Sequence, residues 1–209
     1  MKRLLIILLV LAALLAACSS AAVRNDLTYQ GTYDSYKAFL ENWTRSDRLY
    51  HNFSTELIIS ATYFSLPMRR AFVAEWVRSY DLPPSEQDKL LQEQMADAGR
   101  SVEFIVAFYT AKFSFNDLDE PDSTWRLWLI DAQGNKVAPS KIERMKIKHE
   151  KEIYFFPTYT EWNRLYRAVF PALGDDGKPL VLNSGTITLR ATSVEGKVDL
   201  VWEIPEHIH

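Results

Sequence analysis

The chain has 209 residues, of which 47% are hydrophobic and 13% aromatic, and this composition argues against wholesale disorder. The length fits one ordinary domain with a sizeable core. The formal net charge is −3, and it becomes −5 when Lys2 and Arg3 are left out. Because nucleic-acid binding requires a basic face, this mild acidity excludes nucleic acid from the expected partners.

The N-terminal segment has the pattern of a secretion signal. Lys2 and Arg3 form a positive start, and the 14 residues from Leu4 to Ala17 are all apolar. A membrane-spanning helix needs about 20 such residues, so this run is too short to span a bilayer. The pattern predicts that residues 1–17 are a signal peptide.

The apolar run ends in Leu15-Ala16-Ala17-Cys18, which resembles the lipobox of bacterial lipoproteins. The resemblance covers residues 1–18. It implies that the leader is cleaved before Cys18 and that the cysteine carries acyl chains such as palmitate. Cys18 is the only cysteine, so it has no disulfide partner within the chain, and acylation would use its thiol. The alternative is an ordinary signal peptide that contains a cysteine by chance.

Ser19 follows the modified cysteine. In the lipoproteins that this segment resembles, aspartate at this position retains the protein in the inner membrane, whereas serine permits export to the outer one. The resemblance therefore implies a lipid anchor in the bacterial cell envelope, at the outer membrane and facing the periplasm. Residues 18–30 are expected to be a flexible tether, and residues 31–209 a single globular domain.

A first helix is expected over residues 33–45. Its apolar residues recur with helical spacing and share one face: Tyr36, Phe39, Leu40 and Trp43. A strand is expected next, in which apolar and polar residues alternate. Its apolar set is Leu57, Ile59, Ala61 and Tyr63.

Two further helices are expected, over residues 67–80 and 85–98. Ser85 and Asp88 resemble a capping box at the start of the second of these, and Gly99 follows its end, where a helix C-terminal glycine belongs. The front half of the chain therefore places two helices between strands.

Residues 101–204 have a β pattern. The alternation of apolar residues along the first expected strand changes phase between Phe108 and Phe113, which favours a bulge at residues 109–111. The last two strands form a hairpin with Glu195-Gly196 as its turn. This register places three cross-strand pairs on one face: Ala191 with Leu200, Leu189 with Trp202, and Ile187 with Ile204.

About seven strands with short turns, and no βαβ rhythm, predict a mainly β (α+β) fold. The expected architecture is an antiparallel immunoglobulin-like β-sandwich with two or three helices in its N-terminal half. The likeness to immunoglobulin domains is one of pattern, because the Cys…Trp…Cys signature of true immunoglobulin domains is missing.

Motifs for catalysis and zinc binding are missing from the sequence. There is no G-x-S-x-G, no HExxH and no CxxC, and only four histidines occur. No catalytic residue and no cofactor are therefore expected. The acidic loop 116–122 is a candidate calcium site through Asp117, Asp119 and Asp122, and its alternative is an ordinary acidic turn at the surface.

The densest aromatic run begins at Tyr154 and ends at Phe170. Residues 164–170 are an expected strand, so Tyr159 and Trp162 fall on the loop before it and are the candidates for surface recognition. Exposed aromatic rings bind sugars and proteins because they bury much area at little entropic cost. The neighbouring residues 141–151 carry several lysines and arginines interrupted by glutamates. A solvated strand face and contact with anionic headgroups are the two alternatives for them.

Two classes of function fit these observations. The first is a non-enzymatic binding module, held in the envelope by the lipid on Cys18, that interacts with an envelope protein or a cell-wall component. The second is an enzyme acting on envelope polysaccharide or lipid, or a carrier of a small ligand. Glycoside hydrolysis requires two carboxylates that face each other about 5 to 10 Å apart, and spacing along the sequence does not identify such a pair.

Overall fold

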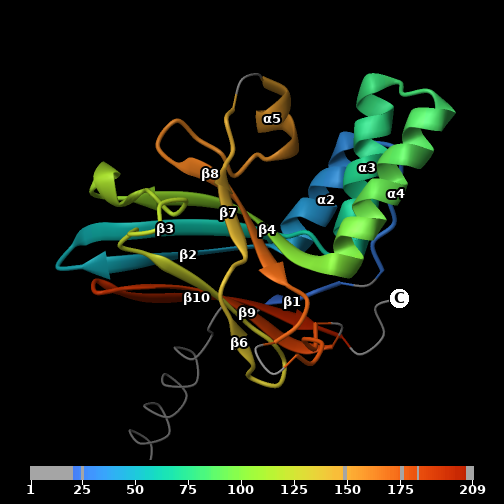
Figure 1. Cartoon of the computed structure of the whole chain (residues 1–209). Helices are drawn as coiled ribbons and strands as arrows, with labels where there is room; N and C mark the ends of the chain where they lie inside the picture. The colour runs from blue at the N-terminus through green and yellow to red at the C-terminus, as the bar shows by residue number, and fades with distance from the viewer. Residues whose placement is uncertain (1–20, 25, 148–149, 175–176, 183, 206–209) are drawn as a thin grey trace, which may run out of the picture.

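A computed structural model describes residues 21–24, 26–147, 150–174, 177–182 and 184–205. They form two mainly antiparallel sheets, with the helices mostly in the N-terminal half of the chain (Figure 1). Within these residues, none of the helices has the length and apolar character needed to cross a membrane.

Each sheet contains five strands in the described part of the chain. In the first sheet the strand order is β1 (Ala21–Ala22), β10 (Gly196–Ile204), β9 (Gly185–Ser193), β5 (Arg126–Ile130) and β6 (Lys136–Val137). In the second sheet the order is β2 (Thr44–His51), β3 (Ser54–Tyr63), β4 (Ser101–Thr110), β8 (Arg164–Pro171) and β7 (Lys141–Arg144). Only β1 pairs with its neighbour in parallel.

Aromatic rings from both sheets meet in one core. The ring centroids of Phe104 on β4 and Trp202 on β10 lie 5.3 Å apart, and those of Phe108 and Trp125 lie 5.9 Å apart. Trp202 donates its indole N–H to the carbonyl oxygen of Trp43 at 2.8 Å. Buried apolar residues of both sheets therefore belong to one hydrophobic cluster.

Helix α2 (Tyr33–Trp43) confirms the predicted helical face, because Tyr36, Phe39, Leu40 and Trp43 are its buried residues. Thr32 and Ser35 form a reciprocal capping box at its N-terminus. The helix ends two residues earlier than expected, and the chain continues directly into β2, a strand that the sequence analysis does not include.

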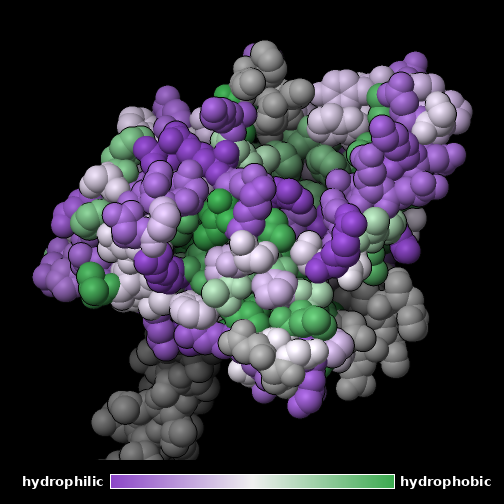
Figure 2. All heavy atoms as spheres, viewed as in Figure 1, coloured by the Kyte–Doolittle hydropathy of each residue, from purple (hydrophilic) through white to green (hydrophobic). Residues whose placement is uncertain are grey.

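The next two helices lie where they were predicted, but their ends differ. Helix α3 (Leu66–Tyr80) is followed by its C-cap residue Asp81, which has left-handed backbone conformation. Helix α4 (Pro84–Arg100) starts one residue before Ser85, so the expected capping box does not form. Gly99 lies inside α4 rather than after it. The surface over α4 is largely hydrophilic (Figure 2), as expected for a helix in which no residue is fully buried. A short helix that the pattern did not indicate, α5 (Glu150–Phe155), precedes β8.

The final hairpin is present, but its predicted register is wrong by two residues. The observed pairs are Ala191 with Val198, Leu189 with Leu200, and Ile187 with Trp202. The turn is Val194-Glu195, and Gly196 begins β10. Gly196 has a φ of 144°, a backbone conformation that side chains disfavour, and a Cβ there would also lie 3.0 Å from the side chain of Leu49 on β2. Backbone conformation and close packing therefore both favour glycine at this position. A shift of two residues keeps the same face buried.

The expected bulge at residues 109–111 is also corrected. Strand β4 ends at Thr110, and Phe113–Phe115 form a 3₁₀ turn, η1. The change of phase therefore marks the end of the strand.

The structure differs from the expected tether in residues 21–24 and 26–30. Ala21 and Ala22 pair with Trp202 and Glu203 of β10, and Val23 is buried. The main-chain nitrogen of Arg24 donates to the side chain of Asn42 at 2.8 Å. The chain is thus attached to the domain from Ala21 onward.

Candidate functional site

A cavity of about 500 Å³ lies where the ends of the two sheets meet α3 and α4. Its walls come from six parts of the chain: the end of α2, the β3–α3 junction, the contact between α4 and β4, Ala172 after β8, the segment 179–182, and the end of β10. The main apolar lining residues are Tyr63, Phe64, Val102, Leu180, Leu182 and Ile204. Its volume and apolar lining are those of a small-molecule site.

Hydrogen bonds fix the wall at the β3–α3 junction. The main-chain nitrogen of Phe64 donates to the carbonyl of Glu103 at 2.9 Å, which extends the β3–β4 pairing by one residue. Ser65 then caps α3 by accepting from the main-chain nitrogen of Met68. The strand therefore turns into the helix at a defined point, and Phe64 and Leu66 border the cavity there.

The opposite wall is held by Asp131, a buried carboxylate at the end of β5. It accepts hydrogen bonds from the main-chain nitrogens of Gln133, Asn135 and Val181 at 2.8 to 2.9 Å. Burial alone would raise the pKa of Asp131, but these donors hold it below its usual value. The bond to Val181 places its neighbours Leu180 and Leu182 in the lining.

A buried ionic network ties the helices to the second sheet beside the cavity. Glu103 on β4 binds Arg69 of α3 at 2.7 Å and Arg167 of β8 at 2.6 Å. Burial alone would raise the pKa of Glu103, but hydrogen bonds and charge from the two arginines hold it lowered. Arg69 also donates to Gln94 of α4 and to the carbonyl of Phe64. Since Glu103 stays ionised, its role here is to position the cavity wall.

Tyr63 supplies a free polar group in this lining. Its hydroxyl makes no hydrogen bond to the described residues, whereas the hydroxyls of Ser65 and Ser101 are both engaged. Burial raises the pKa of Tyr63 to about 12, so the phenol is neutral at physiological pH. A neutral hydroxyl among apolar side chains fits a ligand that is mostly apolar and carries one hydrogen-bonding group.

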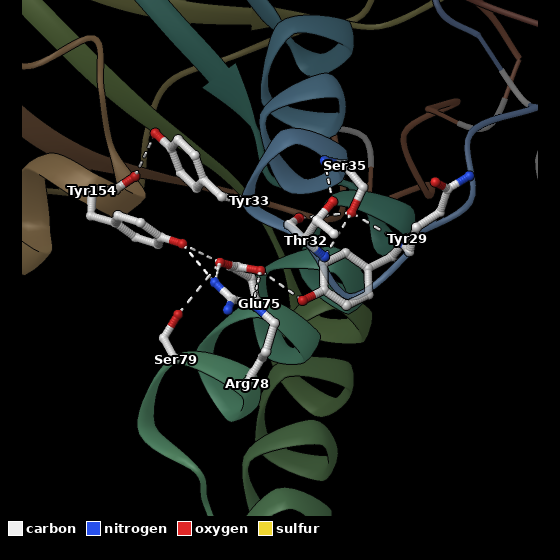
Figure 3. Close-up of polar contacts among 9 residues, drawn as sticks. Tyr29, Thr32, Tyr33, Ser35, Glu75, Arg78, Ser79 and Tyr154 are labelled. Atoms are coloured by element: carbon white, nitrogen blue, oxygen red, sulfur yellow. Dashed lines mark hydrogen bonds and ion pairs between the residues drawn. The ribbon is translucent and has the colours of Figure 1, made fainter.

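Another buried carboxylate, Glu75 of α3, joins three parts of the chain (Figure 3). It accepts a hydrogen bond of 2.6 Å from the hydroxyl of Tyr29 and another from the hydroxyl of Tyr154 on α5. Arg78, one turn along α3, binds both of its oxygens. The N-terminal segment and α5 are thereby both fixed to α3.

The charges around Glu75 explain what it can do chemically. Burial alone would raise its pKa, but Arg78 and the two phenols lower it to about 2. Burial, together with the hydrogen bond to the Glu75 carboxylate, raises the pKa of Tyr29 to about 12. None of these groups exchanges a proton near neutral pH, so the cluster is a structural clamp rather than an acid–base pair.

The two predicted recognition residues lie on the loop between α5 and β8, as the sequence indicates. Trp162 is 70% exposed, whereas Tyr159 is half-buried. Tyr159 lines a separate cavity of about 400 Å³ whose other walls include Arg144, Lys146 and Arg164. The structure therefore places one aromatic residue beside a group of cations and leaves the other at the surface.

The acidic loop 116–122 does not form a metal site in the structure. Asp117 accepts a hydrogen bond from Ser123 at 2.7 Å, while Asp119 and Asp122 are exposed. Across the described residues, no three acidic, histidine or cysteine side chains are grouped so that they could hold a metal ion. The predicted calcium ligands are thus not brought together.

Cys18 and Ser19 lie outside the described residues, which begin three residues after the cysteine. Searches of protein families, curated proteins and solved structures give no match to this chain.

Sequence reasoning missed the apolar cavity. Its lining residues were assigned to strands and to core, and they come from segments as far apart as Tyr63 and Ile204. The open space between these segments distinguishes the site from ordinary core, and that space becomes visible only in three dimensions.

Proposed function

We propose that the protein is a lipid-anchored envelope protein whose domain is a non-enzymatic binding module. The anchor is the acylated Cys18, and Ser19 directs the protein to the outer membrane, facing the periplasm. The lipobox pattern supports this, because a short apolar run ends in two alanines and the single cysteine. Replacement of the cysteine, Cys18→Ala, should release the protein from the membrane fraction. Mass spectrometry of the native protein should find acyl chains on residue 18, and an unmodified thiol would contradict the anchor.

The ligand of this module is a mostly apolar small molecule with one hydrogen-bonding group. The observation that carries this proposal is the 500 Å³ cavity, whose lining includes Tyr63, a residue with no hydrogen-bond partner for its hydroxyl among the described residues. Three buried carboxylates of the domain have lowered pKa values: Glu75 and Glu103 through arginines, and Asp131 through main-chain hydrogen bonds. Their stable ionisation supports binding rather than proton-transfer chemistry. An acyl chain with a polar head belongs to this ligand class.

Photocrosslinking in cells tests the cavity. A photoreactive benzoylphenylalanine is placed at Ala98, which borders the cavity, and in a matched chain at Ala96, which is exposed on the same helix. We expect residue 98 to capture a small apolar molecule that mass spectrometry detects and residue 96 to capture none. Tyr63→Phe, which removes only the hydroxyl, should reduce the yield at residue 98. Equal products at both positions would exclude the cavity as the site.

The two sheets are proposed to form the expected immunoglobulin-like β-sandwich. Two observations support this: rings from both sheets interleave in one core, and the chain passes from one sheet to the other after β4, β6 and β8. Such crossings between sheets are typical of sandwich folds. An experimentally determined structure in which the sheets do not pack face to face would contradict it.

A second candidate is recognition of an anionic envelope component, such as a charged polysaccharide, beside Tyr159 and Trp162. A specific observation favours it: the Nε of Arg164 is buried and has no hydrogen-bond partner among the described residues. Arg144 and Lys146 line the same cavity. A benzoylphenylalanine at Trp162 should capture the partner, whether saccharide or envelope protein. Tyr159→Ala and Arg164→Gln should each abolish that product, and unchanged capture would contradict this candidate.

A further inference from the structure

One end of the two sheets, here called the turn end, carries exposed apolar side chains on two neighbouring turns. It consists of the β2–β3 turn, Asn52-Phe53, and the β9–β10 turn, Val194-Glu195. Phe53 is fully exposed, Val194 is 94% exposed and Tyr50 is 57% exposed. Exposed apolar residues gathered on turns are a feature of interaction sites.

The two turns lie side by side although they belong to different sheets (Figure 1). Leu49 of β2 lies against Gly196 of β10, with its Cδ2 3.0 Å from where a side chain at residue 196 would begin. Further along, Arg45 of β2 donates to the carbonyl of Val201 at 3.0 Å. The two strands thus run next to each other in opposite directions, and both turns project from the same end of the molecule.

The backbone at Phe53 is strained. Asn52 and Phe53 have φ values of 46° and 69°, as a two-residue turn of this hairpin type requires at both positions. Glycine is the favoured residue at the second position, and asparagine tolerates the first, but a bulky side chain is a true outlier there. The fully exposed ring of Phe53 makes no aromatic contact with the described residues that would offset this strain. A partner outside the domain that binds the ring would offset it.

The N-terminal strand indicates which partner is within reach. Strand β1 runs parallel to β10, with Ala21 level with Trp202. Cys18 precedes Ala21 by three residues, so it lies within about 11 Å of it even when the chain is fully extended. Because β1 is parallel to β10, Ala21 is the end of β1 nearer the turn end, which lies six residues, or about 20 Å, along β10. The proposed lipid on Cys18 therefore keeps a bilayer within reach of this side of the domain.

We propose that the turn end inserts Phe53 and Val194 into the bilayer that holds the lipid of Cys18. Tyr50 lies at the level of the headgroups, where its ring is buried and its hydroxyl, which accepts a hydrogen bond from Arg48, stays hydrated. This inference rests on the proposed lipid anchor. The charged side chains around the two turns balance in sign: Arg48, Lys112 and Lys197 against Asp47, Glu56 and Glu195. Insertion is thus apolar and depends little on anionic lipid.

The orientation that follows places the cavity at the opposite end of β2 and β10 from the inserted turns. Both strands run from the turn end to the cavity, where Trp43 and Ile204 line its wall. Because Cys18 lies within about 11 Å of Ala21 and the turn end lies about 20 Å from Ala21, both meet one bilayer only when β10 is tilted toward the membrane plane. The cavity therefore lies nearer to the bilayer than the full length of β10.

Site-specific fluorescence tests this inference on the mature protein. The processed chain is reconstituted into vesicles of phosphatidylethanolamine and phosphatidylglycerol. Single cysteines at Phe53, at Val194 and, as a control, at the exposed Leu91 of α4 carry an environment-sensitive nitrobenzoxadiazole label. Because acylation occupies the thiol of Cys18, each label is unique. We expect labels at residues 53 and 194 to brighten several-fold and to be quenched by lipids with nitroxide-labelled chains, while the label at residue 91 is quenched only by aqueous iodide.

Three outcomes separate the two proposals. Quenching by labelled lipids at residues 53 and 194 alone supports insertion. An acylated chain that stays on the vesicles but leaves both labels accessible to iodide overturns the insertion and leaves the anchor intact. A processed chain with an unmodified Cys18 that stays off the vesicles overturns both proposals. The labelled Val194→Cys chain keeps the inference testable if Phe53→Cys fails to fold.

Discussion

The cavity end and the turn end of the two sheets differ in the side chains that they bury and expose. At the cavity end, the buried carboxylates are paired: Glu103 with two arginines, and Asp131 with three main-chain nitrogens. At the turn end, apolar side chains are exposed, and the strained Phe53 has no aromatic contact with the described residues.

This difference indicates where the fold is rigid and where it depends on its surroundings. A buried charge that loses its partner has no water to replace it, so the cavity end tolerates little change. An exposed ring on a turn leaves the core untouched when it is removed. Substitutions at the two ends should therefore differ in both size and sign, and four predictions follow this contrast from the largest effect to the smallest.

The largest loss is expected for Glu103→Gln. The substitution leaves Arg69, which is 1% exposed, without a counter-charge, and this should lower the free energy of unfolding by about 4 kcal/mol. Urea denaturation measures the loss. Glu93→Gln is the matched control, because Glu93 forms only an exposed contact of 4.0 Å with Lys89 and should change stability very little. Equal effects from the two substitutions would show that the buried network does not hold the cavity end.

The second effect is a loss of stability in acid that depends on Glu75. Its pKa is lowered in the folded state from 4.5 to about 2. A carboxylate with a lowered pKa contributes stability above its unfolded pKa and loses that contribution as the pH falls toward the folded value. The contribution, no more than about 3 kcal/mol, is thus present at pH 6 and declines between about pH 4.5 and 2.

The measurement compares urea unfolding of the native chain and Glu75→Gln at pH 6 and pH 3. The difference between them should shrink at the lower pH, because only the native chain loses the contribution of Glu75. Glu103, Asp131 and Asp199 lose stability in both chains alike, so their losses cancel. A difference that stays constant with pH would mean that the clamp is not ionic.

The contrast between the ends also explains what sequence reasoning could and could not predict. The buried face of α2 follows from one local spacing, and it was predicted residue by residue. The register of the last hairpin was missed by two residues because glycine was assigned to the turn. Gly196 instead begins β10, where its φ of 144° and the close approach of Leu49, a residue of another strand almost 150 positions earlier, both favour glycine.

The same limit applies to the candidate site. The loop position of Tyr159 and Trp162 was predicted, since the strand that follows them has a clear pattern. The cations around Tyr159 and the apolar lining around Tyr63 arise only when distant segments pack together. Strand β2 was missed for a related reason: only one of its eight residues, Arg45, is buried, so it lacks the alternation that identifies a half-buried strand.

The third prediction is a gain in stability rather than a loss. Phe53→Gly removes the strain of a left-handed backbone and should raise the free energy of unfolding in detergent solution by about 1 kcal/mol. Asn52→Gly is the control and should gain less, because asparagine tolerates this conformation. Thermal or urea unfolding measures both. A loss of stability in Phe53→Gly would show that the ring packs against the domain, which would remove the reason to expect a partner in the membrane.

The smallest effect is expected for Asp199→Asn, which breaks the ion pair with Arg190 between β9 and β10. Both side chains are about one-third exposed, so the pair should contribute only about 0.5 kcal/mol. Solvent-exposed pairs are screened by salt, so this contribution should disappear in about 1 M sodium chloride, whereas the loss from Glu103→Gln should persist. If both losses faded together with salt, the network at the cavity end would be as accessible to water as a surface pair, and its rigidity would need another cause.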